Sequence, residues 1–542
     1  MQLFLAFVVA LSTTAALIPL LSRWAPAVGL TDRPGPRKVH AVPVPRVGGL
    51  AMAVGILVPV LATVPLTAPI RGVLLGIVIL LGFGLWDDRA ELGYRTKLLG
   101  QILAVAVCML VGGVEIGKVM IDGRTLPPGW ISGAITFVFL LGITNAVNLT
   151  DGLDGLAGGL VLLCLCAVAL FAAAGGQSAV VALCLIEAGA ILGFLRFNTH
   201  PARIFMGDSG SQVLGFSVGA LSLLATQSLD SDLSAALPIL LLGLPILDTL
   251  TVMTTRIRAG KSPFTADKNH LHHRLLAIGF SHRESVAVVY LLQVGLVLLA
   301  YFMRFEADLE VVAVFCVFAA VVLGLLHLAK TTGWHLQHDA PRSAKHLAFL
   351  PSAERLPSIA AGVMLGSLMA YAVTVLLTVP HVGKDLGVLS LAMLGILVLL
   401  SASNAREPLH WFERTTAYVG VVLLVYLDQT DPQRSPTLAT LSWTLIGVTG
   451  VAALARFWLS RTRRFQVTTL DLIVVFVALV LPNLPGSLQL PDYLPQGIAK
   501  AVILVYVIEM LLTIDLRRLM PRLILGVVLT AIAGRAFLGT AV

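Results

Sequence analysis

Long apolar segments, separated by short polar ones, run through nearly the whole chain. A helix that crosses a bilayer needs roughly 20 apolar residues, and about eighteen segments come close to that length. The pattern predicts helices near 1–21, 48–68, 72–86, 97–114, 130–147, 156–174, 179–196, 210–226, 234–255, 285–303, 310–329, 357–379, 387–402, 415–427, 437–458, 467–482, 498–514 and 523–541. We therefore expect an all-α polytopic membrane protein with about 18 transmembrane helices.

The basic residues are distributed unevenly between these segments. If the N-terminus lies outside, the loops that would face the cytoplasm contain 29 of the 37 Lys and Arg residues. Cytoplasmic loops of membrane proteins carry such an excess, so we expect this orientation. No Lys or Arg precedes the first apolar segment, as would be typical of a signal peptide, and we expect an uncleaved first helix.

Composition excludes several other classes of protein. Of 542 residues, 57% are hydrophobic and 12% are charged, against about 45–50% and 25% in a soluble domain. A soluble enzyme, a disordered chain and a disulfide-stapled domain are therefore excluded. The net charge of +8 is explained by the cytoplasmic loops, so no nucleic-acid partner is expected. The five cysteines lie in apolar runs and are interpreted as small hydrophobic residues.

Five polar segments interrupt the apolar pattern, and all five fall on the predicted cytoplasmic side. They are 37–49, 86–101, 145–159, 197–211 and 267–274. Their carboxylates suit Mg²⁺, which commonly takes one or two protein carboxylates plus substrate phosphates. Their Arg, Lys and His side chains can donate to phosphate oxygens. The segments together indicate phosphoryl transfer from a nucleotide-linked donor at the membrane surface, to an acceptor in the bilayer.

Each polar residue also has an ordinary structural interpretation. The Asp87–Asp88 pair could be loop charge, and Asp151 and Asp154 could cap the next helix. Phe205 could be an interfacial aromatic rather than a residue that stacks on a base. The co-occurrence of these residues in one set of loops favours chemistry.

A histidine cluster lies in the last polar segment, where His270, His272 and His273 precede Arg274. This cluster could be a solvated loop, a zinc site or part of the phosphate site. The spacing has no companion Cys and no His-Glu-x-x-His helix, which disfavours zinc.

The competing class is a secondary transporter, because single acids lie within apolar segments at Glu187, Asp248 and Glu509. Transporters place their sites near the midplane, commonly on repeated halves. Here the acids cluster at the predicted cytoplasmic helix ends, and the motifs do not recur after residue 331. Asp248 lies about 12 Å into the membrane from Arg256 and either lines the site or forms a structural pair. A transferase fused to a transport or scaffold module stays open.

The motifs over residues 1–330 resemble a known family. The sequence elements that carry the resemblance are Asp87-Asp88, Asn145 and Asn148, Asp-Gly-Leu-Asp-Gly-Leu-Ala at 151–157, Phe-Met-Gly-Asp-Ser-Gly-Ser at 205–211 and His-Leu-His-His-Arg at 270–274. They are similar to those of the polyprenyl-phosphate N-acetylhexosamine-1-phosphate transferases, of the glycosyltransferase 4 type. The loop 262–274 looks more like the N-acetylglucosamine branch than the phospho-N-acetylmuramoyl-pentapeptide branch, which remains the alternative.

The resemblance implies a reaction and a location. Sugar 1-phosphate, with N-acetylglucosamine favoured, passes from a UDP-sugar to undecaprenyl phosphate with Mg²⁺ or Mn²⁺, and UMP is released. This step initiates a cell-envelope glycan, such as lipopolysaccharide or teichoic acid, at the cytoplasmic face of a bacterial inner membrane. A homodimer is left open.

The resemblance also implies roles for residues. Asp87, Asp88 and Asp208 take catalytic positions, with Asp208 and Asp88 as metal ligands. The expected substrate-binding residues are Lys97, Asn145, Asn148, Asp151, Asp154, Asn198, Phe205, His270, His272, His273 and Arg274. The family's aspartate-rich motif often ends in a third Asp, where this chain has Glu91.

We expect three regions along the chain. Residues 1–330 form the transferase core with about 11 helices, 331–356 form a cytoplasmic linker, and 357–542 form an extension of about 7 helices with unknown function.

A phosphate monoester has its second pKa near 6, so the acceptor phosphate is mostly dianionic at neutral pH. Direct attack is favoured, and a covalent intermediate on Asp87 or Asp88 remains the alternative.

Overall fold

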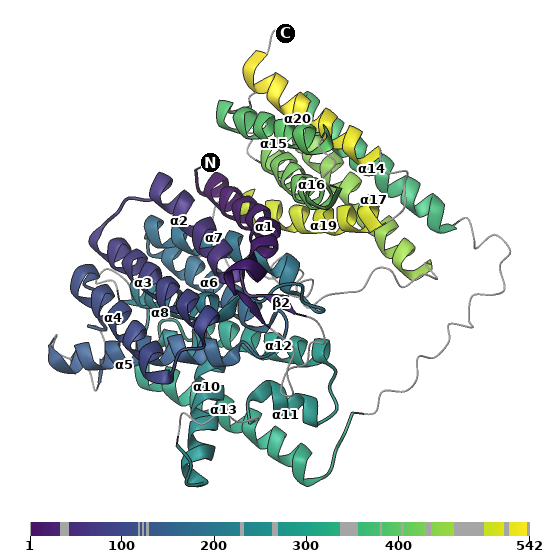
Figure 1. Cartoon of the computed structure of the whole chain (residues 1–542). Coiled ribbons are helices and arrows are strands. Elements are labelled where there is room, and N and C mark those ends of the chain that lie inside the picture. The colour runs from purple at the N-terminus through teal and green to yellow at the C-terminus, as the bar shows by residue number, and fades with distance from the viewer. Residues whose placement is uncertain are drawn as a thin grey trace. The chain divides into compact units, whose positions relative to one another are not determined.

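The computed structural model describes most of the chain. The described residues are 2–32, 43–117, 120–121, 124–125, 129–227, 232–262, 269–336, 356–379, 382–402, 406–429, 435–459, 493–513 and 520–538. They belong to two compact units, one up to residue 336 and one from residue 356 onward. In Figure 1 the first unit runs from purple to teal and the second from green to yellow.

The first unit is a helix bundle. Its helices are α1 (Gln2–Val28), α2 (Gly48–Thr63), α3 (Ala68–Ala90), α4 (Tyr94–Gly112), α5 (Trp130–Thr150), α6 (Leu156–Ala174), α7 (Ser178–Asn198), α8 (Gly207–Thr226), α9 (Leu237–Leu241), α10 (Gly243–Arg258), α11 (Leu271–Ala277), α12 (His282–Phe302) and α13 (Asp308–Thr331). Two short antiparallel pairs join β1 (Thr31–Asp32) to β2 (Val44–Pro45), and β3 (Met120–Ile121) to β4 (Arg124–Thr125).

Helix α8 lies at the centre of this unit. It packs against α2, α3, α5 and α6, and nearly all of its residues are buried. Small residues allow these close approaches: a Cβ on Gly215 would lie 2.9 Å from the Val147 Cβ, and one on Gly76 would meet the Phe216 ring. The N-terminus of α8 is thereby surrounded by the helix ends that carry the polar segments.

The protein is an all-helical, polytopic membrane protein. Ten of the described helices are long and apolar enough to cross a membrane. Each predicted apolar segment within the described residues coincides with helix, and the segment 467–482 lies outside them. The count of 18 crossings and their orientation stay predictions.

The predicted helix 234–255 is divided into α9 and α10 at Leu242. Pro245 has no backbone N–H, so the Leu241 carbonyl lacks its helical partner four residues on. Two side chains supply donors instead: Gln293 Nε2 lies 2.7 Å from that carbonyl oxygen, and Cys164 Sγ lies 3.0 Å from it. The break is therefore satisfied by neighbouring helices, as membrane interiors require.

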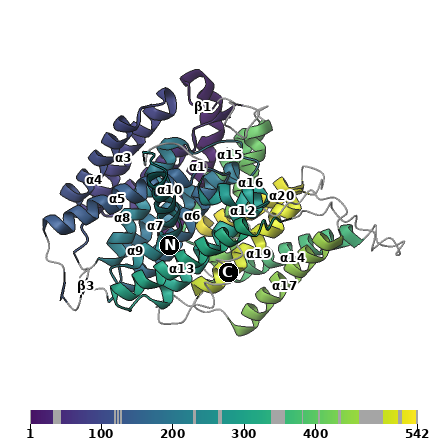
Figure 2. The same cartoon turned by 90° about the horizontal axis from the view of Figure 1, so that it is seen from below.

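The second unit is also helical. It contains α14 (Leu356–Thr378), α15 (Lys384–Ala402), α16 (Arg406–Gln429), α17 (Pro436–Leu459), α19 (Tyr493–Thr513) and α20 (Met520–Leu538). Helix α14 packs against α17, α15 against α20, and α16 against α19. Figure 2 shows α14 and α17 side by side.

A buried ion pair joins three helices of the second unit. Lys500 Nζ on α19 lies 2.8 Å from Asp428 Oδ2 on α16 and 3.1 Å from Ser442 Oγ on α17. The Ser442 hydroxyl donates to the same carboxylate, and the ammonium also lies 4.9 Å from the centre of the Trp443 ring. Lys500 is 1% exposed, so its charge depends on these partners.

Candidate active site

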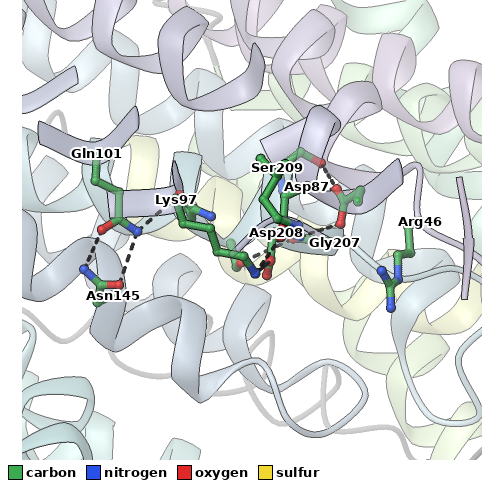
Figure 3. A network of polar contacts seen from close by, with 12 residues as sticks. Arg46, Asp87, Lys97, Gln101, Asn145, Gly207, Asp208 and Ser209 are labelled. Atoms are coloured by element: carbon green, nitrogen blue, oxygen red, sulfur yellow. Dashed lines mark hydrogen bonds and ion pairs between the residues drawn. The ribbon is translucent and has the colours of Figure 1, made fainter. Parts of the chain in front are cut away.

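Lys97 joins two carboxylates from different helices. Its Nζ lies 2.6 Å from Asp87 Oδ2, near the end of α3, and 2.6 Å from Asp208 Oδ2, in the first turn of α8 (Figure 3). The side chains of Lys97 and Asp208 are 32% and 26% exposed, whereas Asp87 is buried. The cluster therefore offers one accessible cation and one accessible anion.

Asp88 caps the N-terminus of α8. Its Oδ1 accepts from the Asp208 backbone N–H at 2.8 Å, and its Oδ2 accepts from Ser209 N at 3.1 Å and Ser209 Oγ at 2.7 Å. A carboxylate here satisfies helix amides that have no intrahelical partner. Gly207 has φ +71°, and a Cβ on it would lie 2.4 Å from Asp88 Oδ2, so this turn requires glycine. Asp88 thus fixes the backbone that carries Asp208.

Phe205 lies beside the segment that leads into α2. Its N–H donates to the Pro45 carbonyl at 2.8 Å, and its own carbonyl accepts from Gly48 N at 3.0 Å. A Cβ on Gly49 would lie 2.3 Å from Gly210 N, so the starts of α2 and α8 are in direct contact. Arg46 follows Pro45 and pairs with Asp32. Figure 3 shows Arg46 on one side of the Lys97 cluster and Gln101 with Asn145 on the other.

Amide side chains link α4, α5 and α8. Asn145 Nδ2 donates to Gln101 Oε1 at 2.7 Å, and Gln101 Nε2 lies 3.2 Å from both Asn145 Oδ1 and Gln212 Oε1. Asn148, one turn beyond Asn145, hydrogen-bonds to the Asp208 carboxylate. Asn148 therefore belongs to the Lys97 cluster, whereas Asn145 positions the helices around it.

Asp151 directly follows α5 and lies in an acidic environment. Burial, together with the charges of Asp208 and Asp154, raises the pKa of Asp151 to about 7. Desolvation and the charges of neighbouring carboxylates account for this raised pKa. A divalent cation would stabilise such a group of oxygens.

The donor set of this cluster fits Mg²⁺ or Mn²⁺. Asp208 and Asp151 offer carboxylate oxygens, which are the ligands that hard cations prefer, and Asn148 donates a hydrogen bond to the Asp208 carboxylate. The Asp88 carboxylate already accepts hydrogen bonds from Asp208 N, Ser209 N and Ser209 Oγ, so it is the less available oxygen donor.

Asn198 connects two loops. Its Oδ1 accepts from Gly155 N at 2.9 Å, and its Nδ2 donates to the Ile204 carbonyl at 2.9 Å. Tyr290 also donates to the Gly155 carbonyl, at 2.6 Å. Because Asn198 is only 3% exposed, its amide holds the loop after α5 next to Phe205.

Asp154 is paired with a histidine. Its Oδ2 lies 2.7 Å from His200 Nδ1 and accepts from Ala202 N at 3.0 Å. The two aspartates of the 151–157 motif therefore have different partners: Asp151 is surrounded by the charges of Asp208, Asp154 and Asp88, whereas Asp154 is hydrogen-bonded to His200.

Asp248 orients the histidine segment. Its Oδ2 lies 2.8 Å from His270 Nδ1, and its Oδ1 accepts from Leu271 N at 2.6 Å. The segment predicted as a loop is helical at α11, because this carboxylate caps its first turn. Of the two roles left open for Asp248, the structure shows a structural pair. Residues 267–268 lie outside the described residues.

His272 contacts the loop that follows α5. A Cβ on Gly152 would lie 2.4 Å from His272 Nε2, and the His272 ring lies parallel to that of His270, with centroids 5.7 Å apart. Burial lowers the pKa of His272 to about 4, so the ring is neutral at pH 7. His273 lies against this ring, and Arg274 Nε donates to the Asn269 carbonyl.

Several residues that position the site were not among the predicted site residues, namely Gln101, Ser209 and Asp248. Asp248 and Gln101 are polar residues in otherwise apolar helices, which is the signal that marks them. Glu187, for which the sequence shows no partner, accepts from Ser217 Oγ at 2.9 Å inside the bundle.

Comparison with known proteins places the chain among relatives. The model of a family described as glycosyl transferase family 4 matches residues 70–226. A probable undecaprenyl-phosphate N-acetylglucosaminyl 1-phosphate transferase of Bacillus subtilis is 40% identical over 295 residues, covering 54% of this chain and 82% of the relative. A decaprenyl-phosphate N-acetylglucosaminephosphotransferase of Mycobacterium tuberculosis is 37% identical over 303 residues, covering 49% of this chain and 73% of the relative. An undecaprenyl-phosphate alpha-N-acetylglucosaminyl 1-phosphate transferase of Escherichia coli is 28% identical over 269 residues, covering 48% of this chain and 73% of the relative.

Proposed function

The chain belongs to the polyprenyl-phosphate N-acetylhexosamine-1-phosphate transferases of glycosyl transferase family 4, and we propose its substrates. The donor is UDP-N-acetylglucosamine, the acceptor is undecaprenyl phosphate, and the second product is UMP. The names of all three relatives specify N-acetylglucosamine, which supports this sugar over a muramoyl-pentapeptide.

The observation that carries the proposal is the position of Lys97 between Asp87 and Asp208, at 2.6 Å from each. Phosphoryl transfer depends mainly on positioning and on neutralising negative charge. The partly exposed Lys97 ammonium donates to the phosphate oxygens of the donor. Asp87, buried and itself bonded to Leu92 N at 2.6 Å, holds that ammonium in place.

We assign the divalent cation to Asp208, with Asp151, whose pKa is raised by the charge of Asp208, as a further oxygen donor. When bound, Mg²⁺ or Mn²⁺ neutralises the charge of the donor pyrophosphate. Asp88 keeps the first turn of α8 in place and so positions Asp208, a role that differs from the ligand role expected from the motif.

Direct displacement is the mechanism that these contacts support. The acceptor phosphate is mostly dianionic at neutral pH and can attack without a general base. Asp88 accepts from Ser209 and from Asp208 N, and Asp87 is buried in its pair with Lys97. Neither carboxylate is available as a nucleophile. Enzyme incubated with donor alone should release no stoichiometric UMP, and a burst of one UMP per enzyme would establish the covalent alternative.

Phe205 is the residue we assign to the uracil ring. Its backbone is held between Pro45 and Gly48, and its side chain is half-buried. Stacking acts equally in the ground and transition states, so Phe205→Ala should raise the KM for the UDP-sugar more than it lowers kcat. If only the KM of the lipid changes, the residue belongs to the acceptor site.

We propose that the site faces the cytoplasm of a bacterial inner membrane, with the N-terminus outside and about 18 crossings. The excess of Lys and Arg in one set of loops supports this orientation. An impermeant thiol reagent applied to sealed inside-out vesicles should label a cysteine placed at Arg95, which lies in the short segment around the start of α4. Labelling only in right-side-out vesicles would reverse the topology.

We also propose that residues 1–330 are the transferase core and that 357–542 are a separate extension. The described site residues all lie in the first compact unit, and the relatives match about half of this chain. A chain that ends near Ala344 should transfer sugar phosphate within about tenfold of the full chain. A monodisperse but inactive truncation would show that the extension helps to build the site.

The deciding experiment is a substrate panel with the full chain in nanodiscs. Undecaprenyl phosphate is incubated with labelled UDP-N-acetylglucosamine, UDP-N-acetylgalactosamine or UDP-N-acetylmuramoyl-pentapeptide, and lipid-linked sugar and UMP are measured. We expect product from the first donor, and none from an Asp208→Asn control. Product only from the muramoyl donor, or UDP instead of UMP as the leaving group, would contradict the proposal.

A further inference from the structure

The turn between α5 and α6 is held by residues from two other helices. Gly155, the residue before α6, has φ +80°, and both of its backbone polar groups are hydrogen-bonded. Its N–H donates to Asn198 Oδ1, at the end of α7, at 2.9 Å. Its carbonyl accepts from the Tyr290 hydroxyl on α12 at 2.6 Å and from Gly159 N in α6 at 3.0 Å. Tyr290 therefore adds a contact from a helix 135 residues later in the chain.

Tyr290 is 3% exposed, so its hydroxyl lies inside the bundle. A buried hydroxyl requires hydrogen-bond partners, and the Gly155 carbonyl, with two lone pairs, supplies one. A second side chain of α12 reaches the same turn, since the His282 ring hydrogen-bonds to the backbone of Asp154. Helix α12 therefore fixes the end of this turn at two points.

The same turn carries the two aspartates of the 151–157 motif. Asp151 lies among the charges of neighbouring carboxylates, and Asp154 is one of the residues that the family resemblance assigns to substrate. Groups that bind a reacting substrate lose much of their effect when they are displaced by about 1 Å. The hydrogen bond from Tyr290 thus bears on where both carboxylates lie.

We propose that Tyr290 is a positioning residue for the UDP-sugar: its hydroxyl holds the Gly155 carbonyl and so keeps the turn 151–155 in the position that binds the donor. This role rests on the proposed function, and it belongs to a residue outside all the motifs that carry the family resemblance. Tyr290 acts through the turn rather than on the reacting atoms, so removing its hydroxyl weakens donor binding in the ground and transition states alike. Such a loss raises KM and leaves kcat nearly unchanged.

The test uses the full chain in nanodiscs, with the concentrations of donor and acceptor varied. Tyr290→Phe removes the hydroxyl and keeps the ring. We expect its KM for UDP-N-acetylglucosamine to rise about three- to tenfold, the scale of one hydrogen bond, with kcat and the KM for undecaprenyl phosphate near the wild-type values. Tyr301→Phe, the same change near the other end of α12, is the matched control. It should keep the wild-type KM, because the ring on which the Arg304 guanidinium stacks is retained.

A double-mutant cycle tests whether Tyr290 acts through the turn. In the Asp154→Asn background, Tyr290→Phe should change the donor KM by clearly less than in the wild type, since residues that act as one unit are not additive. Full additivity, or a Tyr290→Phe variant with a lower Tm but an unchanged donor KM, would overturn the proposal and leave Tyr290 a packing residue. Wild type that forms no lipid-linked product from any donor of the panel would instead contradict the proposed function, and this role with it.

Discussion

Lys97 Nζ lies 2.6 Å from Asp208 Oδ2, although 111 residues separate them in the chain. Asp87 shares the same ammonium, so one cation serves two carboxylates. The arrangement makes the first turns of α4 and α8 depend on each other electrostatically.

Replacing Lys97 with Met should therefore reduce kcat by at least about 100-fold, the scale seen when one charge-stabilising donor is removed from a reacting group. Lys97→Arg should retain part of the activity, because it keeps the charge. Steady-state kinetics, with the concentrations of both substrates varied, measure the kcat of each variant. Lys261→Met, at an exposed lysine beyond α10, is the control, and an equal loss there would contradict a specific role for Lys97.

Asp208→Asn should abolish transfer at any Mg²⁺ concentration. The substitution keeps the side-chain volume and removes the charge assigned to the cation, while Lys97 keeps its pair with Asp87, so the protein should still fold. Activity measured across a Mg²⁺ titration tests the assignment. Substantial turnover at saturating Mg²⁺ would show that another residue holds the ion.

Gly84 on α3 should not tolerate alanine. A Cβ there would lie 2.3 Å from Ser209 Cα and 2.7 Å from Ser209 N, both backbone atoms of α8. The two helices would have to separate, at a cost of about 1–3 kcal/mol, and Asp88 would move from the amides that it caps.

Gly82, on the same helix as Gly84, provides the matched control, since a Cβ there would meet nothing within 4 Å. Thermal unfolding and activity of Gly84→Ala and Gly82→Ala should differ clearly, with only the first impaired. Equal behaviour of the two variants would argue against the close contact of α3 and α8.

His272 should make the stability of the first unit depend on pH. Burial lowers its pKa to about 4, below the value near 6.5 of an unfolded chain. The unfolded state therefore binds more protons, and stability that is present above pH 6.5 is lost as pH falls toward 4. Between pH 7 and 5 the loss from this group should be about 2 kcal/mol.

Unfolding measured at pH 7, 6 and 5 tests this dependence. His272→Gln should flatten the slope, because glutamine does not titrate. A variant with the same slope as the wild type would assign the dependence to other groups.

Lys500→Met should destabilise the second unit. It leaves the buried Asp428 carboxylate without its ammonium, and breaking such a pair from one side costs about 3–5 kcal/mol. The double variant with Asp428→Leu should recover much of the loss, because no buried charge is then left unpaired. Thermal unfolding of the full chain measures both variants, and an unchanged Tm for Lys500→Met would contradict the importance of the pair.

Much of the architecture could be predicted because the bilayer restricts what a chain can do. Apolar runs of about 20 residues must form helices, since every backbone polar group needs a partner within the membrane. The predicted 156–174 is α6 without change. The family match and the relatives confirm the resemblance drawn from the motifs. The motifs could be recognised in a single sequence because their residues belong to short contiguous segments.

The contacts between segments could not be predicted. Apolar length does not show that Pro245 would divide α9 from α10, because the break depends on Gln293 and Cys164 reaching the freed Leu241 carbonyl. Nor does the Asp-Asp pair show that Asp87 would hold Lys97 while Asp88 caps α8.

The sequence by itself therefore determined the helices, the polar segments and the family, since these follow from local hydrophobicity and from residues close together in the chain. Only the tertiary structure decided which polar atoms meet: Asp208 with Lys97, Asp248 with His270, and Asp154 with His200. The physical reason is that a hydrogen bond or ion pair depends on distances of about 3 Å. Those distances are set by how α3, α8 and α10 pack against their neighbours, and helix packing depends on side-chain shape over the whole interface.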